Sequence, residues 1–211
     1  MQQRANKVVL SLLLLLAVAA HGQQGVPVAD VDLSRKSQSL PLEGYAVFLE
    51  DAPGAMMLGD AMRAHRDGKF KPLNNVDLSQ GVTGSAFWLR LAVRNVDSRN
   101  LQWVLSHDYG FAQIMNVYQI DAEQEITGDS SRAITTELRE DTPYSQRPIR
   151  FRSFAVPFET RPGELDILYV RLTVNYANTQ ILALRVAPRV VFDSWAAGDR
   201  SFHFFFYGIL F

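Results

Sequence analysis

The sequence contains no cysteine among its 211 residues, which excludes disulfide frameworks and cysteine-ligated metal sites. It also lacks a Gly-rich phosphate loop, a nucleophile elbow and a His-Glu metal-binding helix. The net charge of −1 provides no electrostatic basis for binding nucleic acid. These absences predict a protein that is not an enzyme, has no metal or cofactor and does not bind nucleic acid.

Two short stretches retain some capacity to bind a cation. His107 and Asp108 are adjacent, but neighbouring side chains on a strand point to opposite faces, which favours a solvated loop pair instead. Asp121 to Glu125 offers carboxylate ligands for calcium without the dense acidic spacing of a dedicated calcium loop. The pattern there favours a polar hairpin turn.

The N-terminus has the layout of a secretory signal peptide. Arg4 and Lys7 precede an uncharged run from Val8 to Ala20, and small residues follow. The run has 13 residues, fewer than the roughly 20 that a membrane-spanning helix needs. We therefore predict a signal peptide over residues 1–22 and export to the periplasm, with an uncleaved N-terminal anchor as the alternative.

Alternating apolar and polar residues dominate the middle of the chain. After an expected extended lead-in over residues 23–39, one helix is expected near residues 56–66, ended by Gly68. Period-two alternation is clearest at 86–95, 164–175 and 181–192. Several short strands with turn signals between them predict an all-β antiparallel β-sandwich over residues 40–193.

On these strands, the face opposite the apolar one carries aromatic rings and arginines. The candidate ligand-binding residues are Trp88, Arg90, Arg94, Tyr118, Tyr169, Arg171 and Arg185. If the strands are neighbours in one sheet, flat rings and guanidinium groups suit sugar rings or carboxylates. One alternative is an ordinary solvent-exposed face, and another is that the second sheet or the N-terminal helix covers Trp88.

The end of the chain is strongly apolar, with the sequence FHFFFYGILF over residues 202–211. Trp195, Arg200 and His203 are typical of a membrane interface. We expect residues 194–211 to be a juxtamembrane segment and the start of a truncated first transmembrane helix. The alternative is a C-terminal strand or helix buried in the sandwich.

Several motifs occur in an order that resembles a known family. They are Trp88-Leu89-Arg90 with Asn95; Ile114, Val117 and Tyr118; Thr127-Gly128-Asp129; Phe154 through Phe158; Pro162-Gly163; and Leu168-Tyr169-Val170-Arg171. Over roughly residues 40–192 the chain resembles the periplasmic type 2 extracellular sensor domain of bacterial seven-transmembrane receptors with diverse intracellular signalling modules (7TMR-DISM).

The resemblance implies a jelly-roll-like β-sandwich similar to carbohydrate-binding modules. It implies a sensor that binds a carbohydrate or similar small molecule and relays this through a membrane region anchored in the inner membrane. An output module, such as a diguanylate cyclase or histidine kinase, is expected in full-length relatives and is absent here. Expected partners are the ligand, the inner membrane and, as an option, a second copy in a homodimer. The alternative is a secreted, stand-alone carbohydrate-binding protein.

Overall fold

The computed structural model describes residues 29–31, 39–96, 98–99, 101–107, 114–174 and 178–198. The helices are α2 (Leu58–Arg66), α3 (Ala122–Thr127) and residues 189–198, with single 3-10 turns at Asn75–Asp77 and Tyr144–Gln146. The strands are β1 (Ala29–Val31), β2 (Leu40–Pro41), β3 (Ala46–Asp51), β4 (Lys71–Pro72), β5 (Ser79–Thr83), β6 (Ala86–Asn95), β7 (Leu101–His107), β8 (Ile114–Asp121), β9 (Ile134–Arg139), β10 (Ala155–Thr160), β11 (Leu165–Thr173), β12 (Asn178–Ile181) and β13 (Leu184–Pro188).

The strands form two main sheets, which confirms the all-β prediction. A seven-stranded sheet has the order β4-β3-β6-β11-β8-β9, with β1 paired in parallel to the end of β6. A four-stranded sheet has the order β10-β7-β13-β2, and β12 pairs with β5 in a small separate sheet. Apart from β1, every strand pairing is antiparallel. Similarity to carbohydrate-binding modules stays a prediction.

The main hydrophobic core lies between these two sheets. The alternating apolar residues of β6 and β11 point into it, as the sequence pattern predicts. The four-stranded sheet contributes apolar residues from β7, β10 and β13 to the same cluster. Both sheets thus bury one apolar face against the other, which is the packing that defines a β-sandwich.

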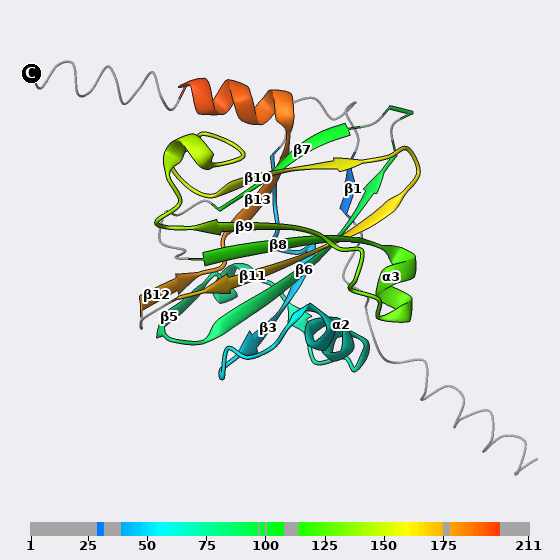
Figure 1. Ribbon diagram of the computed structural model, residues 1–211, viewed down its shortest axis with the longest axis vertical. Coiled ribbons are helices and arrows are strands. Elements are labelled where there is room, and N and C mark those ends of the chain that lie inside the picture. The colour runs from blue at the N-terminus through cyan, green and yellow to red at the C-terminus, as the bar shows by residue number, and fades with distance from the viewer. Residues whose placement is uncertain are drawn as a thin grey trace, which may run out of the picture.

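Helices cover parts of both outer faces (Figure 1). α2 packs Leu58, Ala61 and Met62 against Trp88 and Tyr169 on the outer face of the seven-stranded sheet. The helix at 189–198 packs against the outer face of the four-stranded sheet through its own aromatic and alanine residues. Both sheets therefore have some apolar side chains on the side away from the main core.

α2 begins and ends where the sequence indicates. Asp60 accepts a hydrogen bond from the backbone N–H of Met57 at 3.0 Å, which satisfies a free donor at the helix start. Gly68 follows the helix with a φ of 71°, a left-handed conformation that favours glycine. The helix predicted near residues 56–66 is confirmed.

Two features differ from the sequence-based expectations. The expected polar turn at residues 121–125 is mostly the short helix α3, inserted between β8 and β9. The polar stretch after residue 131 contains β9, an edge strand whose side chains are largely exposed. Leu138 is its one buried apolar residue, so the apolar alternation by which strands are recognised in a sequence is weak.

The predicted chain ends fall largely outside the described residues. Residues 1–22, proposed as a signal peptide, are not described, and only 29–31 and 39 belong to the expected lead-in. Of the 194–211 segment, residues 194–198 continue the helix that starts at 189. No helix within the described ranges is both long and apolar enough to span a bilayer.

We predict that Leu168→Ala destabilises the fold by about 2–5 kcal/mol, because Leu168 is fully buried in the main core and truncation leaves a cavity. Urea denaturation measures this loss. Ile126→Ala is the control, because the Ile126 side chain on α3 is 77% exposed and should change stability by less than about 0.5 kcal/mol. Equal effects of the two substitutions would contradict the packing described here.

Candidate functional site

The structure brings most of the candidate residues to one face. β6, β11 and β8 are neighbours, so Trp88 is in register with Arg171, and Arg90 with Tyr169. Tyr118 on β8 is directly opposite Tyr169. These five side chains occupy the outer face of the seven-stranded sheet, opposite the main core.

Arg185 and Arg94 do not join this group. Arg185 lies on β13 in the four-stranded sheet, where its Nη1 donates to Ser39 Oγ at 2.7 Å, so its assignment to the same patch was wrong. Alternation shows which face of a strand is apolar but not which sheet the strand joins. Arg94 is exposed near the far end of β6, opposite Leu165.

Arg90 is held in a buried ion pair rather than presented to a ligand. Its Nε donates to Glu125 Oε1 at 2.6 Å, and its Nη2 donates to Glu125 Oε2 at 2.7 Å. The Tyr169 hydroxyl donates to Glu125 Oε1 at 2.8 Å, and His65 Nδ1 lies 3.5 Å from the same oxygen. These four residues, His65, Arg90, Glu125 and Tyr169, are called the buried clamp below.

The buried clamp joins both helices to the sheet. Glu125 comes from α3 and His65 from α2, while Arg90 and Tyr169 come from the sheet. Arg66 of α2 also donates from Nη1 to the backbone carbonyl of Glu125 at 3.0 Å. The sequence alone gave no sign of Glu125 as a partner, since the pair is 35 residues apart and its carboxylate lies in a segment expected to be a turn.

Aromatic packing seals the clamp from solvent. The ring of Phe70 lies edge-on to Tyr169, with centroids 6.3 Å apart, and edge-on to His65 at 5.7 Å. Tyr169 is fully buried, and the Arg90 and Glu125 side chains are each 14% exposed. In this shielded setting the charge-assisted hydrogen bonds are stronger than they are at the surface.

The environment shifts the pKa values of the clamp residues. Burial alone raises the pKa of Glu125, but the hydrogen bonds and charge of Arg90 outweigh burial, so its pKa is lowered overall. Burial, aided by the charge of Arg90, lowers the pKa of His65. Burial and the Glu125 carboxylate raise the pKa of Tyr169, so its hydroxyl stays protonated as a donor.

The remaining candidates form a stacked group beside the clamp. The rings of Trp88 and Tyr118 are stacked, with centroids 5.8 Å apart and planes at 23°. The Arg171 guanidinium carbon is 5.9 Å from the Trp88 ring centroid, and its Nη2 donates to the carbonyl of Gly54 at 2.7 Å. Trp88 is fully buried, as in the alternative in which the N-terminal helix covers it.

Two further residues extend this group along the sheet. Asn116 is in register with Arg171, and its Nδ2 donates to Glu137 Oε2 on β9 at 2.7 Å. The five side chains that form this outer-face patch are Trp88, Asn116, Tyr118, Glu137 and Arg171. Sequence reasoning missed Glu137, because β9 was not recognised as a strand.

The outer-face patch has polar atoms that lack partners. Trp88 Nε1 and Arg171 Nε are buried and make no hydrogen bond to any part of the chain that the structure describes. The Tyr118 and Arg171 side chains are half-buried, and the Glu137 side chain is 49% exposed. The patch thus combines an accessible aromatic ring, a guanidinium group and a carboxylate, a set that recognises hydroxyl groups or carboxylates.

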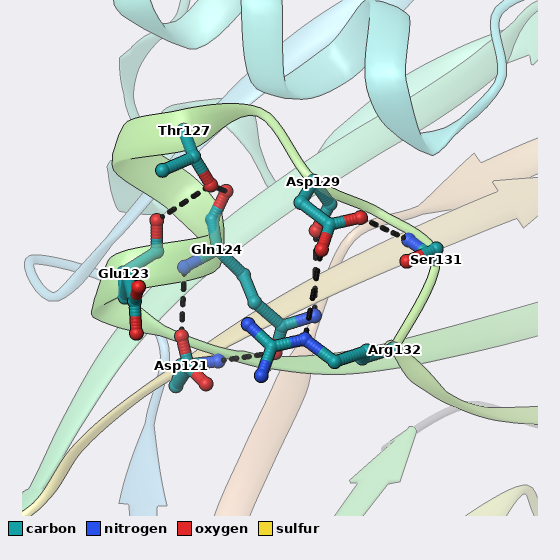
Figure 2. A network of polar contacts seen from close by, with 7 residues as sticks. All are labelled: Asp121, Glu123, Gln124, Thr127, Asp129, Ser131 and Arg132. Atoms are coloured by element: carbon teal, nitrogen blue, oxygen red, sulfur yellow. Dashed lines mark hydrogen bonds and ion pairs between the residues drawn. The ribbon is translucent and has the colours of Figure 1, made fainter.

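Neither candidate cation site gains support. His107 is buried, with Nε2 2.9 Å from the carbonyl oxygen of Ile181, and Asp108 lies outside the described residues. Figure 2 shows Asp121 as the N-cap of α3: its Oδ1 accepts from the Gln124 backbone N–H at 2.7 Å. Over the described ranges, no group of three or more His, Asp or Glu side chains could hold a metal ion.

The fold is thus a two-sheet β-sandwich, and its candidate residues form the buried clamp and an aromatic–arginine patch. The chain belongs to the family of 7TMR-DISM extracellular 2 domains, whose family model matches residues 43–186. This family consists of extracellular sensor domains of receptors, which act outside the cytoplasm and are not catalytic. No curated protein matches the chain.

We predict that Arg90→Ala costs about 3–5 kcal/mol of folding free energy, because the Glu125 carboxylate is then buried without its counter-charge. Urea denaturation measures the loss. The control is Arg63→Ala, which breaks the ion pair between Arg63 and Asp60, also 2.6 Å long. The Arg63 side chain is 64% exposed and the Asp60 side chain is 44% exposed. Solvent screens that surface pair, so its loss should cost far less than the loss of the buried pair. If both substitutions lowered the unfolding free energy by similar small amounts, the Arg90–Glu125 pair would not stabilise the fold as described.

We also predict that acid destabilises the fold through His65. The pKa of His65 in the folded chain lies below 6.5, so the unfolded chain takes up more protons and stability falls as the pH drops below that value. The pKa of Glu125 is held below 4.5, so its contribution is present above 4.5 and is lost in more acidic solution as the pH falls through the folded pKa.

His65→Gln tests this expectation, because glutamine cannot be protonated in this range. Unfolding free energies at about pH 7.5 and about pH 5.5 are compared for both proteins. The loss between the two conditions should be smaller in the variant than in the original chain. An equal loss would mean that His65 does not titrate against folding.

Proposed function

We propose that this chain is the periplasmic ligand-sensing domain of a bacterial seven-transmembrane signalling receptor and that it binds a carbohydrate or a similar hydroxylated small molecule. The outer-face patch is the observation that carries the ligand proposal. Stacked rings, a guanidinium group and an amide–carboxylate pair converge there from four strands, β6, β11, β8 and β9. Rings stack on sugar faces, and the polar groups can bind hydroxyls.

Ligand binding at the patch can affect the rest of the domain through Arg171. Arg171 belongs to the outer-face patch. It also donates a hydrogen bond to the carbonyl of Gly54, in the loop that leads into α2. α2 is joined to the sheet by the buried clamp. A ligand that draws Arg171 toward itself changes its contact with this loop and so acts on α2. In the full receptor, we expect the membrane region to receive this change.

Export and membrane attachment belong to the same proposal. The basic and apolar residues at 1–22 support export by a signal peptide. The apolar residues at 202–211 support attachment to the inner membrane, preceded by aromatic and basic residues of the interface type.

A glycan array with the purified chain tests the ligand proposal. For any sugar bound, Arg171→Ala should weaken binding about tenfold or more, since a hydrogen bond to a charged group contributes about 1.5–3 kcal/mol. Arg150→Ala, at an exposed position away from the patch, should leave affinity unchanged. The melting temperature of each variant verifies that the fold is intact. An array without binding, or binding indifferent to Arg171, would reject the outer-face patch as a sugar site.

A further inference from the structure

The interior of the sandwich becomes polar at one end. On β11 the inward residues Leu172, Val170 and Leu168 are followed by Asp166, which is also buried. On β10, the inward Val156 and Phe158 are followed by Thr160. The same change occurs on β8, from Met115 and Val117 to Gln119 and Asp121. A buried carboxylate at a position that continues an apolar stripe is unfavourable unless something binds it.

A cavity of about 980 Å³ opens at this polar end. The residues that matter most among its lining are Trp103, Gln119, Phe158, Thr160, Glu123 and Asp166. They come from both sheets and from α3, so the cavity lies between the ends of the two sheets. It is called the inter-sheet groove. It is separate from the outer-face patch, because Asp166 and Trp88 lie on opposite faces of the seven-stranded sheet.

Three side chains that line the groove hold polar atoms without a partner. Asp166 Oδ2, Thr160 Oγ1 and Trp103 Nε1 are buried and make no hydrogen bond to any described residue. Asp166 is 8% exposed, Thr160 is 1% exposed and Trp103 is 3% exposed. Buried polar groups in native proteins nearly always have partners, so three together in one cavity indicate a missing partner. A ligand reaches these atoms only after side chains at the rim rotate.

One oxygen of the Asp166 carboxylate, Oδ1, is held by a hydrogen bond from Gln119. Gln119 Nε2 donates to Asp166 Oδ1 at 2.9 Å and to the carbonyl of Glu159 at 2.7 Å. Gln119 thereby joins β8 of one sheet to β10 of the other and holds the Asp166 carboxylate in place. The other oxygen, Oδ2, has no hydrogen-bond partner among the described residues. Burial raises the pKa of Asp166, while the hydrogen bond from Gln119 acts in the opposite direction.

The arginines around the groove are already paired with carboxylates. Arg132 pairs with Asp129 at 3.5 Å, as Figure 2 shows. Arg161 pairs with Glu164 at 3.6 Å, and its charge reaches Asp166 without a direct ion pair.

Arg189 of the C-terminal helix pairs with Asp193 at 2.8 Å. Within the described residues, neither Asp166 nor Glu123 forms a salt bridge. The Asp166 carboxylate at the centre of the groove thus has no ion-pair partner among the described residues, although the charge of Arg161 reaches it.

We propose that the inter-sheet groove binds a small primary amine that also carries hydroxyl groups. The ammonium group donates to Asp166 Oδ2 and supplies the missing positive charge. A hydroxyl oxygen of the ligand accepts from Trp103 Nε1, and the Thr160 hydroxyl completes the contacts. An anion would be repelled by the carboxylates, and a neutral polyol would leave the Asp166 charge without a counter-charge.

Serinol, the amine analogue of glycerol, is the probe, and glycerol is its matched control. In NMR titrations of the purified chain, serinol should shift the indole N–H signal of Trp103, which a Trp103→Phe variant assigns. Glycerol at the same concentrations should not shift it. A glycerol shift equal to that of serinol, or no serinol shift, overturns the proposal.

Variants test the role of the carboxylate. Asp166→Asn keeps the shape and the Gln119 contact but removes the charge, and it should weaken serinol binding about tenfold or more, as expected for a buried charge-assisted contact. Asp141→Asn is the control, since the Asp141 side chain is 77% exposed and lies in the turn after β9. It should bind as the unchanged chain does.

The Arg171→Ala variant should also bind serinol normally. The serinol experiment thus tests the inter-sheet groove independently of the sugar proposal for the outer-face patch. Thermal melting verifies that the Asp166→Asn variant is folded. Unchanged serinol affinity in a folded Asp166→Asn variant overturns the proposal.

Discussion

The bidentate pair between Arg90 and Glu125 is the interaction on which the arrangement of this domain depends. It ties α3 to the centre of the seven-stranded sheet, and α2 joins it through His65 and Arg66. With both helices held there, the outer face of the sheet becomes a second buried layer, with Trp88 and Tyr169 inside it. A carboxylate buried at this position needs its guanidinium partner, so the helices cannot leave without exposing or isolating a charge.

This constraint divides the face into a closed part and an open part. The clamp occupies the closed part, and the outer-face patch lies beside it, where Tyr118 and Arg171 remain half-buried. The inter-sheet groove uses the other face of the same sheet at one end of the sandwich. We therefore propose two chemically different places for a ligand in this domain. One is built from rings and a guanidinium group, and the other from a buried carboxylate.

Much of the fold could be predicted because its strands bury one face. Alternation in β6 and β11 marks their inward residues correctly, and Gly68 marks the end of α2. β9 was not recognised, since most of its side chains are polar and exposed and only Leu138 is buried in the core. Of the candidate residues, Trp88, Tyr118 and Arg171 lie together, whereas Arg185 lies in the other sheet and Arg90 is paired with Glu125.

The sequence by itself determined the all-β class, the position of the first helix and the side of each clear strand that is apolar. These follow from local periodicity and turn residues, which act over a few neighbouring positions. Only the tertiary structure decided which arginines are free. Whether a guanidinium group meets a ligand or a carboxylate depends on partners that are 35 residues away for Arg90 and 117 for Arg171. Strand pairing and helix docking bring these partners together, and no local pattern records them.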